Sequence, residues 1–182
     1  MSSLLGWFGP STADAGVLQA MAGACELPQS ALQTGAAGAC RVAATSPVGG
    51  SDPERIATTD DGNIVAAFAG YLYDNDLDHK RRPAAWCLQL YQQYGKAFPT
   101  HLNGTFAVAI YDYTNGQLHL VTDRTASRGL YYLTQSPWVF GSEVKFILEY
   151  PGVSRTLNHD RLREFLVLEF LPGTATYYDH IR

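Results

Sequence analysis

Cysteine is scarce in this sequence. Cys25, Cys40 and Cys87 are the only three in 182 residues, and they form no C-x-x-C pair and have no nearby histidine at metal-ligand spacing. This pattern argues against a zinc site or a disulfide framework. We expect all three to be small buried apolar residues, with Cys87 on a helix within AAWCLQLYQQYG.

Charge and long apolar runs are scarce as well. Charged residues make up 16% of the chain, the net charge is −4, and the longest basic run, Lys80-Arg81-Arg82, is typical of a solvated loop. An acidic chain of this kind is not expected to bind nucleic acid. No apolar stretch approaches the ~20 residues that span a bilayer, and the opening run lacks the basic flank of a signal peptide. We therefore expect a cytoplasmic protein without a membrane partner.

The chain instead begins with a short apolar segment, which is unusual because chain ends are commonly polar and frayed. Leu4, Leu5, Trp7 and Phe8, closed by Gly9-Pro10, predict a strand that is buried almost from the first residue. A length of 182 residues suits a single domain, and no linker or repeat divides residues 1–182.

Strand patterns dominate the remaining sequence. The clearest hairpin is TFAVAIYDY and QLHLVTDR joined by Thr114-Asn115-Gly116, since Asn-Gly readily adopts the positive φ angles of a primed turn. Both faces of this hairpin are apolar, as in a sheet covered by two layers. Other predicted strands are GNIVAAFAGYLYD, ACRVAAT, and the pair GLYYLTQ and PWVFGSE, which bends at Ser136-Pro137.

Helical patterns are fewer. They cover residues 14–24, the segment from Pro83 to Gly95, SEVKFILEY with Ser142 as a cap, and an amphipathic stretch capped near Asn158. The pattern predicts an α+β domain rich in antiparallel sheet.

Several ordered blocks resemble the glutaminase domain of asparagine synthetases, a class II glutamine amidotransferase family. The matching positions are Leu102, Gly104, Phe106, Ala107 and Asp112; Asp123, Arg124, Leu130, Tyr131 and Tyr132; and Phe140, Ser142, Glu143 and Lys145. Upstream, AGYLYDNDLD retains the family's Gly70 and Tyr73, and FLPGTATYYDHIR resembles the segment that leads into the synthetase domain.

This resemblance implies an N-terminal nucleophile hydrolase fold, an αββα sandwich of two antiparallel sheets between helical layers. In that fold the first residue of the mature chain attacks the glutamine amide while its own α-amine acts as the base. The family's opening C-G-I-x-G best matches Leu5-Gly6-Trp7-Phe8-Gly9, so Leu5 stands at the nucleophile position, and leucine has no lone pair. The alternative is Ser2 exposed by removal of Met1, which needs a shift of three residues, about 10 Å along a strand.

Other pocket positions also depart from the family. The oxyanion-hole Asn aligns with Ala69, Gly70 keeps only its backbone N–H, and the Glu that holds the substrate amine aligns with Tyr71. The family's Ser/Gly-Asp pair is replaced around Arg81-Arg82-Pro83, and Arg41 corresponds to the arginine that grips the glutamine carboxylate, although a lone arginine does not make a site. The resemblance thus implies a degenerate pocket at Leu5, Gly6, Ala69, Gly70 and Tyr71, with no catalytic, binding or metal residue.

Other polar residues are assigned structural roles. Asp123-Arg124 is expected to brace a turn and the contact with a neighbouring domain, and Glu143 and Lys145 to be positioning groups. Asp60-Asp61 and the series Asp74, Asp76 and Asp78 are explained by turn chemistry and solvation.

The resemblance suggests a function for such a domain. Asparagine-synthetase relatives that need no ammonia, the β-lactam synthetases and lasso-peptide macrolactam synthetases, keep the N-terminal domain as a platform. We expect an inactive domain of this kind, with preference for the lasso type. Its expected partner is a C-terminal ATP-pyrophosphatase synthetase domain, in cis or in trans, and a precursor peptide is a further candidate partner. ATP and magnesium would bind that domain, because no S-G-G-x-D-S loop occurs here.

The partner surface is expected to include the last helix and GTATYYDHIR, with Tyr177 and Tyr178 as anchors. Two alternatives stay open: an active glutaminase that uses Ser2, and a free-standing scaffold protein.

Overall fold

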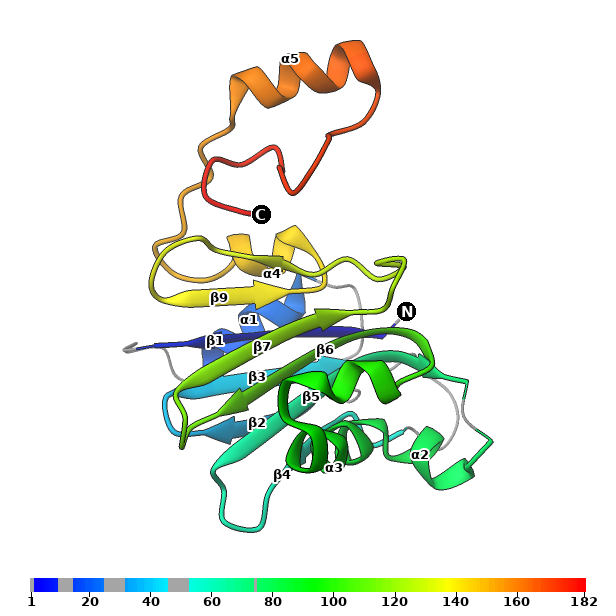
Figure 1. Ribbon diagram of the computed structural model, residues 1–182. Helices are drawn as coiled ribbons and strands as arrows, with labels where there is room; N and C mark the ends of the chain where they lie inside the picture. Colours follow the sequence, from blue (N-terminus) through cyan, green and yellow to red (C-terminus); the bar gives the residue numbers. More distant parts are fainter. Residues whose placement is uncertain (1, 10–14, 25–31, 46–52, 74) are drawn as a thin grey trace.

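The two sheets predicted from the sequence form the centre of the molecule. The computed structural model describes residues 2–9, 15–24, 32–45, 53–73 and 75–182. These residues form two antiparallel sheets with helices on their outer faces (Figure 1). The predicted α+β class, with two sheets between helical layers, is confirmed. Within the described ranges, no helix has the length and apolar character needed to cross a membrane.

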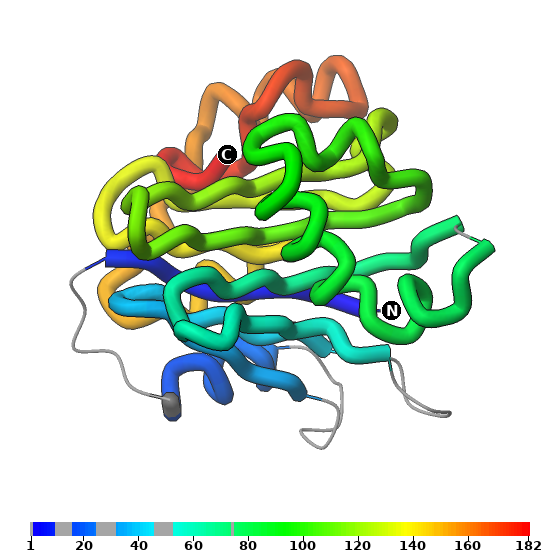
Figure 2. The backbone as a smooth tube through the Cα atoms, turned by 60° about the horizontal axis from the view of Figure 1, so that its bottom comes forward, coloured from blue at the N-terminus to red at the C-terminus, as the bar shows by residue number. Residues whose placement is uncertain are grey.

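The first sheet has the strand order β2-β3-β1-β9-β8. Its strands are β1 (Ser3–Phe8), β2 (Leu32–Ala37), β3 (Cys40–Thr45), β8 (Tyr131–Tyr132) and β9 (Trp138–Gly141). β1 lies at the centre, where it pairs with β3 on one side and β9 on the other. Figure 2, in which β1 is dark blue, shows this strand running through the middle of the molecule. The central position explains why the chain begins with a buried apolar segment.

The second sheet contains the predicted hairpin. Its strands, in spatial order, are β4 (Ile56–Thr58), β5 (Ile64–Leu72), β6 (Gly104–Asp112) and β7 (Gln117–Thr122). Asp112 pairs with Gln117, so four residues form the turn and only Gly116 among them has a positive φ, 61°. The predicted primed turn is therefore wrong. The Asp112 carboxylate stabilises the longer turn by accepting bonds from the backbone and side chain of Asn115.

The helices of the described residues are α1 (Ala15–Gly23), α2 (Leu77–Arg81), α3 (Pro83–Tyr94), the 3-10 helix η2 (Gly95–His101), α4 (Val144–Leu148) and α5 (His159–Leu168). Helices α1 and α4 pack on the first sheet and α3 on the second, whereas α5 lies away from both. α3 begins at Pro83 and ends before Gly95, and Asn158 caps α5 by accepting a bond from the Arg161 N–H, as predicted. Two expectations are wrong. Part of the basic run lies in α2 and not in a loop, and Ser142 accepts a bond from the Leu4 N–H and does not cap α4.

The core has three layers, and β1 contributes to two of them. Leu5 and Trp7 point toward α1 and α4, whereas Leu4 and Phe8 point toward the second sheet. A third cluster lies between the second sheet and α3. Because side chains alternate along a strand, odd positions of β1 face the helices and even positions face the second sheet. This alternation decides which residue can reach the candidate site.

Candidate functional site

Ser2, at the start of β1, lies against the second sheet. Its side-chain Oγ accepts a hydrogen bond from the backbone N–H of Gly70 on β5, at 3.0 Å, and Ser2 is only 2% exposed. Ser2 belongs to the even positions of β1, so its side chain shares a face with Leu4. The buried hydroxyl of Ser2 thus lies beside Gly70, the glycine that the family resemblance identifies as a pocket position.

The structure does not bring Leu5 to this place. Leu5 is fully buried, packs with Trp7 and Leu18 toward α1, and pairs through its backbone with Ala43 and Gly141. The resemblance aligns Leu5 with the nucleophile, whereas in the structure the residue beside Gly70 is Ser2, three positions earlier. An odd shift moves a side chain to the opposite face of the sheet. The position beside Gly70 is therefore held by Ser2 and not by Leu5.

Gly6, the second predicted pocket position, is part of the core. It pairs with Val42 and Phe140, and a Cβ atom added to it would lie 2.5 Å from the Arg41 carbonyl oxygen and 2.7 Å from the Phe140 ring. Glycine is required here by close packing inside the first sheet. Gly6 takes no direct part in the contact between Ser2 and Gly70.

Gly70 has a backbone that other residues do not adopt easily. Its φ is +130°, and an added Cβ would lie 2.0 Å from the carbonyl oxygen of Thr105. The next residues of β5 differ in environment. Ala69 is fully buried between the sheets, whereas Tyr71 is 51% exposed. The site therefore has one backbone donor and no side-chain donor from position 69.

Two arginines approach the Ser2–Gly70 contact from different segments. Arg55, which is 1% exposed, donates from Nη1 to the carbonyl oxygen of Gly70 at 3.2 Å. Arg128 donates from Nη1 to the carbonyl oxygen of Ser2 at 3.1 Å, and its guanidinium lies 5.6 Å from the centre of the Tyr71 ring. Two guanidinium groups therefore hold the backbone carbonyl oxygens of Gly70 and Ser2.

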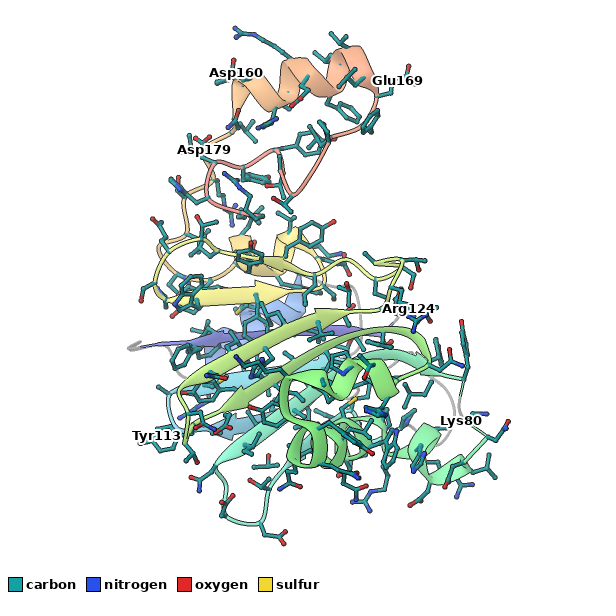
Figure 3. All side chains as sticks on the ribbon, viewed as in Figure 1. Lys80, Tyr113, Arg124, Asp160, Glu169 and Asp179 are labelled. Carbon is teal, nitrogen blue, oxygen red and sulfur yellow. The ribbon has the colours of Figure 1, made fainter. Side chains whose placement is uncertain are left out.

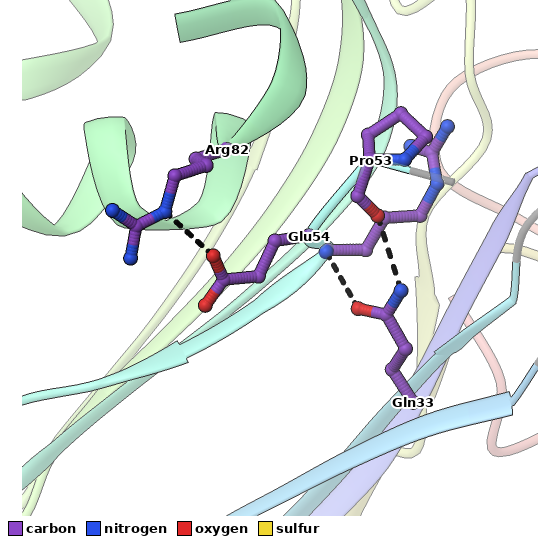
Figure 4. Close-up of polar contacts among 5 residues, drawn as sticks. Gln33, Pro53, Glu54 and Arg82 are labelled. Atoms are coloured by element: carbon purple, nitrogen blue, oxygen red, sulfur yellow. Dashed lines mark hydrogen bonds and ion pairs between the residues drawn. The ribbon is translucent and has the colours of Figure 1, made fainter. Parts of the chain in front are cut away.

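The backbone at Arg55 is fixed by a neighbouring strand. The side-chain amide of Gln33 on β2 accepts from the Arg55 N–H at 2.7 Å and donates to the carbonyl oxygen of Pro53 at 3.0 Å (Figure 4). Beside it, Glu54 forms an ion pair with Arg82 at 2.7 Å. These contacts fix the backbone at Arg55, whose side chain reaches the Gly70 carbonyl oxygen on β5.

The position of Arg128 depends on Asp123. The Asp123 carboxylate accepts bonds from the backbone N–H groups of Phe106, Thr125 and Ser127 and from the hydroxyls of Thr125 and Ser127. Burial acts to raise the pKa of Asp123, but these bonds prevail and hold it far below its usual value. The expected bracing of the turn is confirmed. Arg124 is exposed and projects at the end of the molecule where β1 begins (Figure 3).

Three other predicted positions are accounted for. Glu143 accepts from the Ser3 hydroxyl at 3.4 Å and pairs with Lys145 at 3.0 Å, which agrees with the expected positioning role. Arg41 pairs in register with Trp7, toward the far end of β1, and donates to the carbonyl oxygen of Gly38 at 2.7 Å. Arg41 therefore does not reach the Ser2 region.

The described residues contain no group of three or more His, Cys, Asp or Glu side chains that could hold a metal ion. Asp61 accepts bonds from Thr59 and Asn63, and Asp76 caps α2. Asp74 and Cys25 lie outside the described residues. Burial raises the pKa of the Cys40 thiol to about 12 and that of Cys87 further. Both thiols are therefore neutral and buried.

Comparison with known proteins identifies a family for the chain. The family described as "Glutamine amidotransferase domain" matches residues 84–182, more than half of the chain. The chain belongs to this family. The match includes Asp123 and Arg128 but not Ser2, Ala69 or Gly70, so the roles of the three N-terminal positions rest on geometry.

The relatives are asparagine synthetases. The chain is 31% identical over 93 residues to asparagine synthetase (glutamine-hydrolyzing) 3 of Bacillus subtilis, which covers 50% of this chain and 15% of that protein. It is 28% identical over 109 residues to asparagine synthetase (glutamine-hydrolyzing) 2 of the same organism, covering 54% and 15%. A putative asparagine synthetase (glutamine-hydrolyzing) 2 of Methanocaldococcus jannaschii is 25% identical over 143 residues, covering 70% and 28%. The chain thus spans between about a seventh and a quarter of the length of these relatives.

Sequence reasoning named Ser2 only as the alternative nucleophile, and it missed Arg55 and Arg128. For Ser2 a signal was present, because the alternation of β1 allows only even positions to face the second sheet. For the two arginines there was none, since 73 positions separate Arg55 from Arg128 and only the fold brings them to Gly70 and Ser2.

Proposed function

We propose that this chain is a glutaminase-like domain that does not hydrolyse glutamine, retained as a platform in an ATP-dependent amide-forming enzyme of the asparagine synthetase family. The lasso-peptide macrolactam synthetase is the preferred type and the β-lactam synthetase the second. ATP and magnesium would be held by the synthetase domain, in the same chain or a separate one. No residue of this chain is assigned to them.

The methyl side chain of Ala69, which leaves the Gly70 N–H without a second donor beside it, carries the proposal. An oxyanion hole needs donors that lie 2.7–3.1 Å from the oxygen that becomes negative, and loss of one donor costs ~100-fold or more in rate. Here the remaining backbone donor is bonded to Ser2, and Ala69 offers only a methyl group. Ser2 is also 2% exposed, so its hydroxyl is not open to a substrate amide.

Ammonia release from L-glutamine tests the proposal directly. The protein and its Ser2→Ala variant are expected to release ammonia at the same background rate. Ser2→Cys restores the type of nucleophile that the family uses, and we expect it to stay at background because position 69 still lacks a donor. Activity of Ser2→Cys would show that the pocket is intact apart from its nucleophile, which contradicts the proposal.

A second candidate is an active glutaminase that uses Ser2. The observation that favours it is the same contact, since Ser2 Oγ already lies within hydrogen-bond distance of the expected oxyanion donor. Removal of Met1 would expose the α-amine of Ser2 as the base. Ammonia release that Ser2→Ala abolishes would establish this candidate and reject the first.

The platform role is supported by apolar side chains on the C-terminal part. Leu166 and Val167 of α5 are 79% and 80% exposed, and Phe170 is 59% exposed. α5 stands beyond α4, away from both sheets (Figure 1). Contiguous exposed apolar side chains are typical of interaction surfaces. We assign this face to the synthetase domain.

The residues Tyr177 and Tyr178 lie on the inner side of the same segment. With α5 they line a cleft of about 490 Å³, and the Tyr177 ring packs edge-on against Phe165 with centroids 5.4 Å apart. They therefore support α5, and the exposed Leu166 lines the same cleft.

Substitutions on α5 test the platform role. Leu166→Glu and Val167→Glu are expected to leave this domain folded but to reduce its association with the synthetase domain and the amide-forming rate of the full enzyme. Arg163→Ala, on the same helix and equally exposed, is the matched control. Full activity of the two glutamate variants would contradict the assignment of this surface.

A further inference from the structure

Strand β7 forms one margin of the second sheet (Figure 1). Asp123, directly after β7, donates from its backbone N–H to the carbonyl oxygen of Phe106 opposite, at 3.0 Å. Along an antiparallel pair, the backbone groups of successive residues point alternately toward and away from the neighbouring strand. The N–H and C=O groups of Leu118, Leu120 and Thr122 therefore point away from β6, and in the described part of the chain they have no hydrogen-bond partner. This edge can accept one more strand.

The sequence of β7 does not discourage such pairing. Soluble proteins usually protect an edge strand by keeping it short or by placing charges or proline on it. β7 is six residues long, and QLHLVT contains no proline, lysine, arginine, aspartate or glutamate. β4, at the other margin of the same sheet, has only three residues. The contrast between the two margins favours a partner at β7.

An apolar groove lies beside this edge. It has a volume of about 450 Å³ and is lined by Phe8, Gly116, Leu118, Leu120, Tyr132 and Trp138. The two leucines lie on the inner face of β7 and pack against the core between the sheets. Tyr132 and Trp138 come from β8 and β9 of the first sheet and are 36% and 43% exposed. The open backbone edge and the groove, together called the β7 groove below, thus share Leu118 and Leu120.

The β7 groove fits an extended peptide with apolar side chains at alternate positions. Residues directly opposite each other in an antiparallel pair have their side chains on the same face of the sheet. The residues of an added strand that lie opposite Leu118 and Leu120 would therefore point into the groove. Main-chain hydrogen bonds to the edge supply affinity in this mode of binding, and the groove selects the two side chains. A charged side chain at either position would lose its hydration without gaining a partner, because none of the lining residues is charged.

The size of the groove favours a peptide over a second folded copy of the chain. A stable interface between folded proteins buries about 800 Å² on each side and uses roughly 20–30 residues of each partner. The groove offers six residues. An added peptide strand needs less area, because the main-chain hydrogen bonds along the edge contribute to its binding.

We propose that the β7 groove binds an extended, uncharged segment of the peptide substrate of the amide-forming enzyme. The inference rests on the proposed function and deepens it, because it gives the platform a direct contact with the substrate. It commits to a peptide that carries apolar side chains two positions apart.

Fluorescence anisotropy with a labelled synthetic peptide tests the inference in the full chain. The probe is a fluorescein-labelled, C-terminally amidated peptide of sequence STLTLTS, which has leucine at alternate positions and no charged side chain. One matched peptide, STLLTTS, has adjacent leucines, and another has STLTLTS methylated at the two leucine nitrogens. We expect STLTLTS to bind and both matched peptides to bind about tenfold or more weakly, because one lacks the alternation and the other the donors that face β7.

Substitutions in the protein give a second test with STLTLTS. Trp138→Ala removes one wall of the groove and should weaken binding about tenfold or more. Thr122→Pro removes one outward N–H and keeps the bonds to β6, so it should weaken binding about fivefold. Tyr73→Ala is the control, at an aromatic residue that is 60% exposed and does not line the groove, and should leave binding unchanged.

Several results would overturn the inference: no binding of STLTLTS, equal binding of the methylated peptide, or equal losses in Trp138→Ala and Tyr73→Ala. If Trp138→Ala does not fold, the methylated peptide decides, because that comparison leaves the protein unchanged. Size-exclusion chromatography with light scattering is expected to show a monomer. A dimer that Trp138→Ala dissociates would assign the edge to a second copy and also overturn the inference.

Failure of this inference is distinguishable from failure of the proposed function. Binding of STLTLTS at the β7 groove with background ammonia release supports both. The same binding with ammonia release that Ser2→Ala abolishes keeps the β7 groove and rejects the inactive platform. Absence of peptide binding with background ammonia release rejects only the β7 groove.

Discussion

Asp123 and Arg128 lie five positions apart on one loop but differ in how their hydrogen bonds are satisfied. Asp123 accepts bonds from three residues close to it in space, all of them on β6 or the same loop. Arg128 donates to the carbonyl oxygen of Ser2, and in the described part of the chain its Nε has no partner. Asp123 is a framework group, a side chain whose hydrogen bonds are all made within the fold. The hydrogen bonds of Arg128 to the described residues are incomplete.

A cluster at the opposite end of the hairpin resembles Asp123. The Tyr91 hydroxyl on α3 donates to Asp112 at 3.1 Å and lies 3.2 Å from Nε2 of His119 on β7. Asp112 also accepts from Asn115. The cluster contains a tyrosine, an aspartate and a histidine in contact, a combination that suggests catalysis, yet its bonds are internal and join α3 to the hairpin. The comparison therefore assigns it to the framework.

The largest effect is expected at the backbone of the site. Gly70→Ala places a Cβ atom 2.0 Å from the Thr105 oxygen at a φ of +130°, so we expect a loss of about 3–5 kcal/mol in unfolding free energy or no folded protein. Gly62→Ala is the control, with φ at +72° and open space around it, and should cost about 1 kcal/mol. Urea unfolding measures both. Equal losses would show that the close approach at Gly70 is unimportant.

Loss of the loop anchor is expected to be next in size. Asp123→Ala leaves the N–H groups of Phe106, Thr125 and Ser127 without their acceptor and should lower the unfolding free energy by about 3 kcal/mol. Asp160→Ala, at an exposed carboxylate, should leave the unfolding free energy unchanged. Urea unfolding measures both variants, and an Asp123→Ala protein as stable as the unsubstituted chain would contradict the role of Asp123 as the anchor of the loop.

A low pH should weaken the stabilisation that the Asp123 carboxylate gives to its loop. The folded-state pKa of Asp123 is depressed, so its contribution is complete above its unfolded value of about 4 and is lost as the pH falls toward the folded value. Unfolding free energy measured from pH 5 to pH 2 should therefore fall more steeply in the protein than in Asp123→Asn. Parallel curves would contradict the assignment of a depressed pKa.

A smaller effect is expected in the Tyr91 cluster. Tyr91→Phe removes a hydroxyl that bonds Asp112 and contacts His119, and should lower the unfolding free energy by about 1 kcal/mol in urea unfolding. Tyr113→Phe, at a residue 55% exposed, is the control and should have no measurable effect. An unchanged stability of Tyr91→Phe would contradict the framework assignment.

The smallest effect concerns the pH dependence of His119. Its burial and the charge of Lys96 lower the pKa of His119, against the attraction of Asp112. The unfolded chain then binds the proton more readily, so stability is complete above about pH 6.5 and falls as the pH decreases below that value. Thermal unfolding from pH 7.5 to pH 5.5 should show this slope, and His119→Gln should reduce it. The exposed His101→Gln is the control and should retain the slope.

Much of the fold could be predicted from local patterns. Apolar alternation identified β5, β6 and β7, and Pro83 and Gly95 marked the ends of α3, because these signals act within a few residues. The four-residue turn that ends at Gly116 was missed, since the Asp112 carboxylate stabilises it through contacts that Asn-Gly preferences do not include. Ser142 was misassigned for a similar reason, as its hydroxyl bonds a strand 138 positions away.

The site was less predictable than the fold. Matching short motifs placed Leu5 at the head of the pocket, whereas alternation along β1 gives that place to Ser2. Arg128 and Arg55 act on backbone oxygens that only the folded sheets bring near them. Such contacts follow from the pairing of distant strands, so composition and spacing do not reveal them.

The central place of β1 has a consequence for biosynthesis. Phe8 pairs with Trp138, so the strand made first obtains its second neighbour only after about 130 further residues have been translated. At roughly 5–20 residues per second, the interval is on the order of 10 s. Truncated chains that end before β9 are expected to aggregate through the uncovered edge of β1, and ribosome-associated chaperones are expected to shield it in the cell.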